Sequence, residues 1–301
     1  MSILVIGSAN TDLIIQVDTL PKPGQTILGK NFTTASGGKG ANQAIAIARL
    51  GGKVAFLASI GKDAFGDALI KNYNDAAIDT TLIDRPDCPS GIAMIYVAKN
   101  AENTIAVAPG SNGLLSAKQI CNASAHFTST KIVLAQLEIP IESVLKSAKI
   151  AKENRARFIL NPAPAQNLPA EIFPLIDTIT PNQTEAKMLT GIDVIDEKSA
   201  THAACVLHKT GVNNVIITLG RQGALLYNSD SIKMIAGYPV KAIDTTAAGD
   251  TFNGALVYAL DTGKTITEAI IFANKAAALS VTKFGAQPSI PTLKTVEAFN
   301  P

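Results

Sequence analysis

Cysteine and charge are both scarce in this sequence of 301 residues. Its three cysteines, Cys88, Cys121 and Cys205, are odd in number and far apart, which favours free thiols over a disulfide framework or a zinc site. The chain has 26 lysines and arginines against 24 aspartates and glutamates. This balance gives no electrostatic reason to expect a nucleic-acid partner, because nucleic-acid-binding proteins usually carry a clustered basic excess.

Long apolar segments are lacking as well. No apolar stretch of the sequence approaches the roughly 20 residues that a membrane-spanning helix needs. Residues 1–7 enter a short apolar run without a preceding basic region, which is typical of a first strand and atypical of a signal peptide. The three histidines match neither a metal-site spacing nor a Ser-His-Asp arrangement. We therefore expect a cytoplasmic protein that binds neither nucleic acid nor membrane.

Hydrophobic residues, in contrast, make up 47% of the chain, enough for a sizeable core. Short β-branched apolar runs alternate with longer alanine-rich segments of helical period. This alternation predicts an α/β fold with a central, mostly parallel sheet flanked by helices on both faces. The expected strands are 3–6, 54–60, 132–137, 158–160, 178–179 and 215–219. The expected helices are 40–50, 65–77, 141–154, 185–190, 199–209, 251–262 and 266–282.

Two segments, at about 13–32 and 91–108, interrupt this alternation. Both predict short strands without helices, and both contain turn residues such as those of 21–24 and 99–102. We expect them to form one small antiparallel sheet that projects from a single domain of residues 1–301. A small sheet beside the ligand-binding end of an α/β domain would serve as a lid.

The strongest chemical signal is the run D-T-T-A-A-G-D from Asp244 to Asp250, which follows a strand and precedes a helix. Its small residues leave backbone N–H groups uncovered at a helix N-terminus, which suits an anion. Asp250 alone could equally be a helix cap or a general base on an attacking hydroxyl. The cap reading leaves Asp244 and the small residues between the two carboxylates unexplained.

Two glycine- or amide-bearing segments near the N-terminus are weaker signals. The loop Gly37–Asn42 allows close backbone approach to a ligand, but it does not satisfy the Walker A pattern, and Lys39 could be a solvated turn residue. Asn10 and Asp12 follow the first strand with a spacing that is wrong for a dinucleotide fingerprint. Their amide and carboxylate suit sugar hydroxyls, although an Asx turn explains them about as well.

Two later strand ends could contact a nucleotide. Asn182 and Glu185 are spaced either for a magnesium or phosphate site acting through water, or for a capping box. The glycines of Thr218–Gly223 could form a wall for the nucleotide, and a tight turn explains them equally well.

In this order, these segments resemble the ribokinase family of carbohydrate kinases over nearly the whole chain. The specific motifs are G-G-K-G-A-N at 37–42 and D-T-T-A-A-G-D-T-F-N-G at 244–254, with further shared stretches at 136–138, 161–165 and 285–289. The resemblance implies a ribokinase-like fold and ATP-dependent phosphorylation of D-ribose at O5. It also implies Mg²⁺, an activating K⁺ ion and a homodimer formed through the lid sheet.

The resemblance further implies a role for each matching residue. Asp250 would be the base, and Ala247, Ala248 and Gly249 would form the anion hole. The sugar would lie among Asn10, Asp12, Gly38, Lys39, Gly40, Ala41, Asn42 and Glu138. Glu185 would organise Mg²⁺, and the nucleotide would contact Asn182, Thr218, Leu219, Gly220, Arg221, Gln222, Gly223, Gly249 and Asn274. Potassium would be held, partly by backbone carbonyls, at Asp244, Thr246, Ser280, Lys283, Gly285 and Ser289.

Other functions remain as alternatives. A sister kinase would act on 2-deoxyribose, fructose, a sugar phosphate or a nucleoside, but Asn10, Asp12 and Glu138 favour a neutral polyhydroxylated sugar. Thr11, between the first two, could distinguish ribose from 2-deoxyribose. A non-catalytic sugar-binding regulator would have lost Asp250 or the glycine before it, and an oxidoreductase would carry the dinucleotide fingerprint that is missing here.

Overall fold

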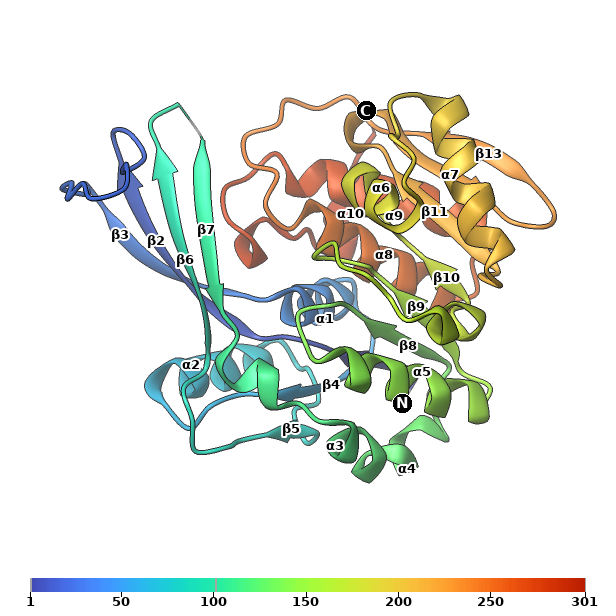
Figure 1. The fold of residues 1–301 in the computed structure, drawn as a ribbon, viewed down its shortest axis with the longest axis horizontal. Coiled ribbons are helices and arrows are strands. Elements are labelled where there is room, and N and C mark those ends of the chain that lie inside the picture. Colours follow the sequence, from blue (N-terminus) through green and yellow to red (C-terminus); the bar gives the residue numbers. More distant parts are fainter. Residues whose placement is uncertain (1, 101, 301) are drawn as a thin grey trace.

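The computed structural model describes residues 2–100 and 102–300. Within these residues, one sheet of nine strands forms the centre of the molecule, in the order β13-β12-β11-β10-β9-β8-β1-β4-β5 (Figure 1). All neighbours from β5 to β11 pair in parallel, whereas β12 and β13 continue the sheet antiparallel. The strands are β1 (Ile3–Ile6), β4 (Val54–Ser59), β5 (Ile83–Asp84), β8 (Ile132–Ala135), β9 (Arg157–Leu160), β10 (Thr178–Ile179), β11 (Asn214–Thr218), β12 (Gly223–Tyr227) and β13 (Ile232–Ala236).

Two hydrophobic cores lie on the two faces of this sheet. Alternate strand residues enter opposite cores, as Ile3 and Leu4 of β1 show. One core is covered by α1 (Lys39–Arg49), α2 (Ala64–Asp75), α8 (Ala248–Asp261), α9 (Ile266–Ser280) and α10 (Leu293–Ala298). The other is covered by α3 (Ala117–Asn122), α4 (Ser124–Phe127), α5 (Ile141–Glu153), α6 (Gln183–Thr190) and α7 (Glu197–Lys209). The predicted α/β architecture is therefore confirmed.

The sequence did not predict three strands of the large sheet. β5 has only two residues, and β12 and β13 form a hairpin without a helix between them. The Asn228 side chain accepts from the backbone N–H groups of Asp230 and Ser231, which closes the hairpin turn. A prediction based on strand and helix alternation misses such a hairpin, since no helical segment marks its ends.

A second, smaller sheet projects from the body of the molecule (Figure 1). Its strands are β2 (Asn10–Val17), β3 (Phe32–Gly37), β6 (Gly91–Ala98) and β7 (Asn103–Ala108), in the order β3-β2-β6-β7. The expectation of a purely antiparallel sheet is wrong, because β2 and β6 pair in parallel with Asn10 opposite Gly91. Both strands leave the body at this point and run outward together. The segment 18–31, inside the first expected range, lies outside any strand.

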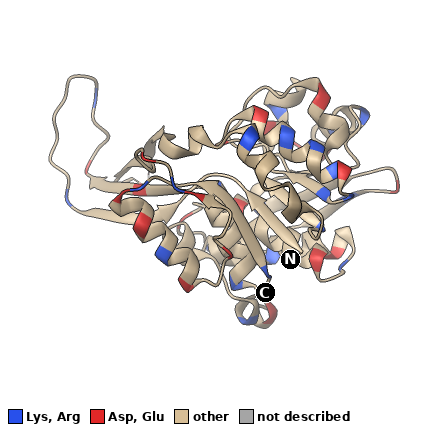
Figure 2. Ribbon diagram, turned by 90° about the horizontal axis from the view of Figure 1, so that it is seen from below, with Lys and Arg blue, Asp and Glu red and all other residues tan. Residues whose placement is uncertain are grey.

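Charged residues of both signs are interspersed over the outer helices (Figure 2), in keeping with the balanced composition. None of the helices in the described part of the chain is long and apolar enough to span a bilayer.

Candidate active site

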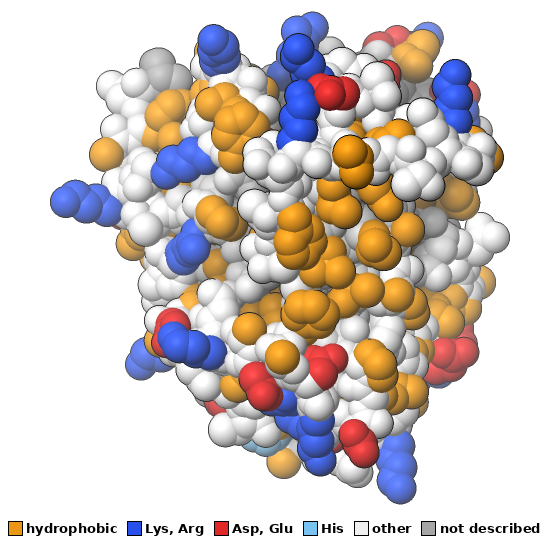
Figure 3. All heavy atoms as spheres, turned by 90° about the vertical axis from the view of Figure 1, so that its left-hand side faces the viewer, with side chains coloured by type: hydrophobic (Ala, Val, Ile, Leu, Met, Phe, Trp, Pro, Cys, Tyr) orange, Lys and Arg blue, Asp and Glu red, His pale blue; other side chains and the backbone are white. Residues whose placement is uncertain are grey.

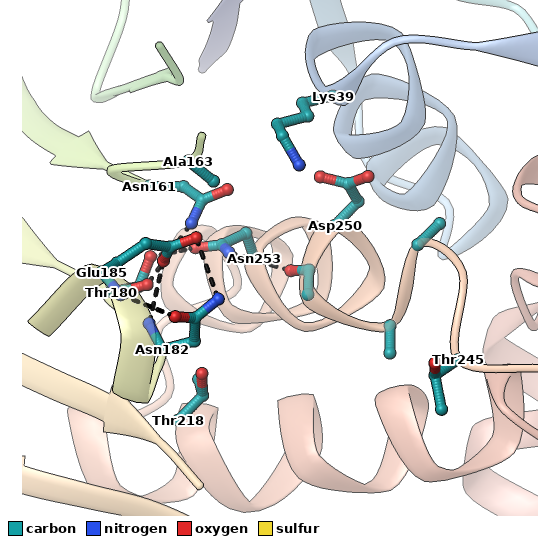
Figure 4. Close-up of a pocket in the computed structure, with 13 residues that line it drawn as sticks. Lys39, Asn161, Ala163, Thr180, Asn182, Glu185, Thr218, Thr245, Asp250 and Asn253 are labelled. Atoms are coloured by element: carbon teal, nitrogen blue, oxygen red, sulfur yellow. Dashed lines mark hydrogen bonds between the residues drawn. The ribbon is translucent and has the colours of Figure 1, made fainter. Parts of the chain in front are cut away.

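Residues from both ends of the chain meet around a cavity of about 220 Å³ at the carboxyl ends of the parallel strands (Figure 4). Its walls come from the start of α1, the ends of β9, β10 and β11, and the start of α8. This is the edge of an α/β sheet at which ligands are expected to bind. The cavity is lined by Lys39, Asn161, Ala163, Thr180, Asn182, Glu185, Thr218, Thr245, Ala247, Ala248, Gly249, Asp250 and Asn253.

The first turn of α8 forms one wall of this cavity. Its N-cap residue Ala247 has a left-handed backbone (φ 59°, ψ 14°), which costs about 1–2 kcal/mol in a residue other than glycine. The first N–H groups of a helix have no intrahelical acceptor, and a Cβ atom added at Gly249 would meet nothing within 4 Å. The Ala248 N–H already donates to the Thr245 carbonyl at 3.2 Å, so the turn offers its other first N–H groups and the positive end of a helix to an anion in the cavity.

Asp250, in the same turn, points away from its own helix terminus and toward α1. Its carboxylate accepts hydrogen bonds from Asn42 Nδ2 (2.9 Å) and Gln43 Nε2 (3.0 Å), and Asn253 Nδ2 instead bonds the Gly249 carbonyl. Because the N-cap residue is Ala247, the helix-cap reading of Asp250 is wrong. Burial raises the pKa of Asp250, although Lys39 and the two amides partly oppose that shift.

A second carboxylate, Asp12, lies in the small sheet and shares the environment of Asp250. Burial raises its pKa to about 7, and the negative charges of Glu138 and Asp250 add to this effect. A Cβ atom at Gly37, in the paired strand β3, would lie 2.4 Å from both Asp12 carboxylate oxygens. Gly37 is therefore required to make room for the Asp12 side chain.

Lys39 lies at the start of α1 with its side chain directed toward Asp250 (Figure 4). Burial opposes the charge of its ammonium group, but nearby carboxylates outweigh that effect and raise its pKa. The carboxylates are those of Asp250, Glu138 and Glu185. Lys39 is thus a cation surrounded by three acids.

Glu138 fixes the start of α1 from the neighbouring strand end. Its Oε2 accepts from Ser8 Oγ (2.6 Å) and from the Lys39 N–H (3.0 Å). A Cβ at Gly38, where φ is 88°, would lie 2.7 Å from the Asn10 nitrogen. The glycine loop, including Gly40 and Ala41 in the first turn of α1, therefore packs directly on the junction between β1 and β2.

Two asparagines have their amides oriented by protein contacts. Asn112, in a 3₁₀ turn at Gly110–Leu114, donates to Asn10 Oδ1 at 2.7 Å, so the Asn10 NH₂ group remains for a ligand. Asn42 Nδ2 is used by Asp250, and its buried Oδ1 has no partner among the described residues. Thr11 lies between Asn10 and Asp12 in β2, so its side chain points to the face of the small sheet opposite these two residues.

The capping box expected at Asn182 and Glu185 is present. Asn182 Oδ1 accepts from the Glu185 N–H, and both carboxylate oxygens of Glu185 accept from the N–H groups of Asn182. Burial is the main cause of a raised Glu185 pKa. Both residues also line the cavity, so the cap holds a carboxylate and an amide toward it (Figure 4).

A larger cavity of about 840 Å³ adjoins the first and shares the start of α8 with it. Of the predicted nucleotide residues, it is lined by Asn182, Thr218, Gly220, Arg221, Gly223, Gly249 and Asn274. Leu219 instead packs in the core, and Gln222 uses its carbonyl to accept from the Gly237 N–H. Apolar lining residues with no motif were missed, namely Tyr238, Pro239, Val240, Ala242, Ala277, Ala278 and Val281.

Asp244 joins the two segments that were expected to hold potassium. Its Oδ1 accepts from the backbone N–H and hydroxyl of Thr246, and its Oδ2 accepts from the Gly285 N–H at 2.8 Å. Burial alone would raise its pKa, but these hydrogen bonds lower it. Ser280 and Ser289 are buried at the two ends of the second segment. Lys283 can offer only its carbonyl to a cation.

Comparison with known proteins agrees with this geometry. Residues 1–293 match the sequence pattern of the pfkB family of carbohydrate kinases. The chain belongs to that family. It is 49% identical over 292 residues to a ribokinase of Haemophilus influenzae, covering 97% of this chain and 95% of that protein. It is also 37% identical over 306 residues to a deoxyribokinase of Salmonella typhi, covering 100% and 98%.

The solved structure of Arabidopsis thaliana ribokinase, complexed with ribose and ATP, superposes on this chain with a TM-score of 0.93. That protein is 32% identical, and the match covers 99% of each chain. The pfkB fold, with its large sheet and its separate small sheet, is therefore shared over the whole length.

Four polar residues of this site were missed by the sequence analysis: Ser8, Gln43, Asn112 and Asn161. Each lies within or close to a segment that the sequence analysis considered, but its hydrogen-bond partners are distant in the sequence. Gln43, for example, donates to Asp250, which is 207 positions away. Spacing along the chain cannot reveal such a partner.

Proposed function

We propose that this pfkB kinase transfers the γ-phosphoryl group of ATP to O5 of D-ribose. The single observation that carries the proposal is the position of Asp250. Asp250 lies in the first turn of α8, the turn that presents N–H groups to the smaller cavity. Asn42 and Gln43 of α1 hold its buried carboxylate, and the larger cavity adjoins the same turn.

The polar groups around Asp250 suit a neutral sugar. Asp12 and Glu138 supply acceptors and Asn10 an amide donor, and Asn42 adds a buried acceptor that has no partner among the residues the structure describes. Lys39 and the backbone of Gly38, Gly40 and Ala41 would complete this site. Sugar hydroxyls both donate and accept, so such a mixed set can satisfy them.

In the proposed reaction, Asp250 accepts the proton of the sugar hydroxyl as its oxygen attacks the γ-phosphorus. The bond from that phosphorus to the bridging oxygen breaks, and ADP leaves with the electron pair. The N–H groups at Ala247, Ala248 and Gly249 would stabilise the charge on the transferred oxygens. The raised pKa of Asp250 makes it a stronger base than an exposed aspartate.

ATP would occupy the larger cavity, with its phosphates extending to the start of α8. Asn182 and Glu185 would hold Mg²⁺ through water, since both Glu185 oxygens already accept hydrogen bonds. Mg²⁺ bound there would neutralise part of the negative charge of the ATP phosphates. Leu219 and Gln222 would act only by shaping the turn around Gly220 and Arg221.

Oxygen ligands suit potassium, and the fold brings the expected ones into two adjoining segments. Asp244 already bridges these segments through Thr246 and Gly285. We propose that carbonyls of Thr246, Ser280, Lys283, Gly285 and Ser289, with Asp244, hold K⁺ close to the anion-binding turn. Bound there, the ion would add positive charge near the transferred phosphoryl group.

The small sheet would act as the lid of a single domain spanning residues 1–301, and it would also form a homodimer. Its face with Asn10 and Asp12 would cover the sugar. Its opposite face exposes apolar side chains, among them Phe32 and Met94. Figure 3 shows hydrophobic side chains gathered on the side of the molecule from which the small sheet projects. Because free sugar and ATP are the proposed substrates, we place the protein in the cytoplasm, which cell fractionation can test.

A coupled ADP-release assay over ribose, 2-deoxyribose, fructose and adenosine, with and without potassium, tests the proposal. We expect the highest kcat/KM with ribose and a further increase with potassium. The second candidate substrate is 2-deoxyribose, because a deoxyribokinase is among the relatives over the full chain. A higher kcat/KM with any other substrate would overturn the assignment of ribose, and ADP release from none of them would overturn the kinase proposal itself.

A further inference from the structure

Two fully buried glutamines connect the proposed base to the interior of the protein. Gln136 Nε2, directly after β8, donates to Gln43 Oε1 at 2.5 Å. Gln43 Nε2, on α1, in turn donates to Asp250 Oδ1 and to Asn161 Oδ1, both at 3.0 Å. Both amide hydrogens of Gln43 are therefore used, one of them on the carboxylate.

The direction of these hydrogen bonds is fixed by the charge on Asp250. An ionised carboxylate can only accept, so Gln43 must turn its NH₂ group toward Asp250. Its carbonyl oxygen then faces Gln136, which must also present an NH₂ group. The opposite orientation of either amide would place two acceptors or two donors against each other.

The backbone leaves space for this arrangement. A Cβ atom at Gly7, at the end of β1, would lie 2.0 Å from Gln136 Oε1. Buried amides cost free energy unless they are satisfied, and apolar side chains would fill the same interior without that cost. A buried glutamine bonded to the Asp250 carboxylate, with a second buried glutamine bonded to the first, thus indicates a role beyond packing.

We propose that Gln43 is a positioning residue, which holds Asp250 Oδ1 while Asn42 holds Oδ2, and that Gln136 fixes the amide of Gln43. With both oxygens held, the plane of the carboxylate is set before the sugar binds. This inference rests on the proposed role of Asp250 as the base. Gln43 acts on the reaction only through that carboxylate.

The test compares Gln43→Met with the wild-type enzyme in kcat, KM for ribose and the pH dependence of kcat. Loss of one hydrogen bond to a charged group predicts a fall in kcat of about ten- to hundredfold, with KM changed by about twofold at most. The Gln43 amide also lowers the pKa of Asp250, so its removal raises that pKa. The acid limb of the kcat profile should therefore move to higher pH, which a purely structural role would not cause.

Two further variants grade the effect. Gln43→Glu keeps the shape and the acceptor for Gln136 but places a second carboxylate beside Asp250, so the acid limb should move further than in Gln43→Met. Gln136→Met leaves Gln43 in place without its partner, and a smaller shift of the same sign is expected.

The matched control is Gln119→Met, because Gln119 Nε2 donates to the Asp84 carboxylate (2.6 Å) on the exposed surface. Its kcat and pH profile should equal those of the wild type.

Ribose binding measured by calorimetry shows whether each variant is folded. The pKa of Asp250 is followed without turnover by ¹³C-carboxyl NMR. The Asp250 signal is the one that disappears in Asp250→Asn. A folded Gln43→Met with unchanged kcat and acid limb would overturn the inference. If Gln43→Met does not fold, an unshifted Asp250 titration in Gln43→Glu would overturn it equally. Asp250→Asn separates the two proposals: full activity in that variant sinks the base assignment, whereas its inactivity beside a normal Gln43→Met sinks only the role of Gln43.

Discussion

Asp12 shows that a single residue of this site can be held in a state that costs stability. Its carboxyl group is buried near two other acids, and its pKa of about 7 lies well above the ordinary value of 3.8. A folded-state pKa above the unfolded one gives stability that is present at low pH and lost as pH rises through about 7. At pH 8 the sugar-free protein therefore carries an unfavourable buried charge at this position.

Replacing Asp12 by asparagine should stabilise the sugar-free protein and weaken ribose binding. The amide cannot ionise, so the gain in melting temperature over the wild type should be larger at pH 8 than at pH 5. Ribose affinity should fall by about tenfold or more, since a hydrogen bond from the sugar to a charged acceptor is lost. Thermal unfolding at both pH values and calorimetric titration with ribose measure the two effects. Equal melting temperatures of variant and wild type at pH 8 would show that Asp12 is not ionised under strain.

For single residues, the sequence predicted which side chains belong to the site better than it predicted their contacts. The motif placed Asp250 at the start of a helix, but only the structure rules out the helix-cap interpretation, because the cap position falls on Ala247. The left-handed backbone of Ala247 had no sequence signal, since alanine rarely adopts it. Thr11 appeared to share a face with Asn10 and Asp12 only because strand alternation was not applied to β2.

Among the elements, the small sheet is unusual in exposing an apolar face. Strand pairing places Leu13 beside Met94 and Ile15 beside Phe32, on the face opposite Asp12. Phe32 is 61% exposed and Met94 41% exposed. A sheet with an exposed apolar face is expected to pack on another surface. A second copy of the same sheet would satisfy this face by symmetry.

Met94→Lys should therefore convert a dimer into a monomer, because the charge would be buried without a partner in the interface. Sedimentation velocity or light scattering coupled to size exclusion measures the change. Ile195→Lys is the matched control, since Ile195 is 79% exposed outside the small sheet, and it should remain dimeric. A wild-type protein that is monomeric at all concentrations, or a dimeric Met94→Lys variant, would contradict the proposed interface.

The sequence predicted that this sheet exists but not how its strands pair. Alternating residues and turn signals at 21–24 and 99–102 marked two strand-rich segments. The parallel pairing of β2 and β6 depends on where both strands leave the body, at Asn10 and Gly91. That junction is formed by contacts between distant segments, so no local pattern reports it.

Across the whole molecule, the architecture followed from periodicity, because buried parallel strands and their covering helices alternate regularly along the chain. The antiparallel pair β12 and β13 escaped that rule. The cavities also depend on the complete fold: the larger one combines residues from 182 to 281, and most of its apolar lining belongs to no motif. The sequence could predict polar candidate residues near the motifs at 37–42 and 244–254, whereas the shape of the larger cavity required the folded chain.

The central claim, that Asp250 removes the proton from the sugar hydroxyl, is tested most directly by the kcat and ribose affinity of Asp250→Asn. General-base catalysis typically raises the rate by about 10²- to 10⁴-fold. The kcat of Asp250→Asn should therefore fall by about 10²-fold or more. Ribose affinity by calorimetry should stay within about tenfold, because Asn10, Asp12 and Glu138 are unchanged. An Asp250→Asn enzyme that turns over ribose at a rate close to that of the wild type would contradict the account.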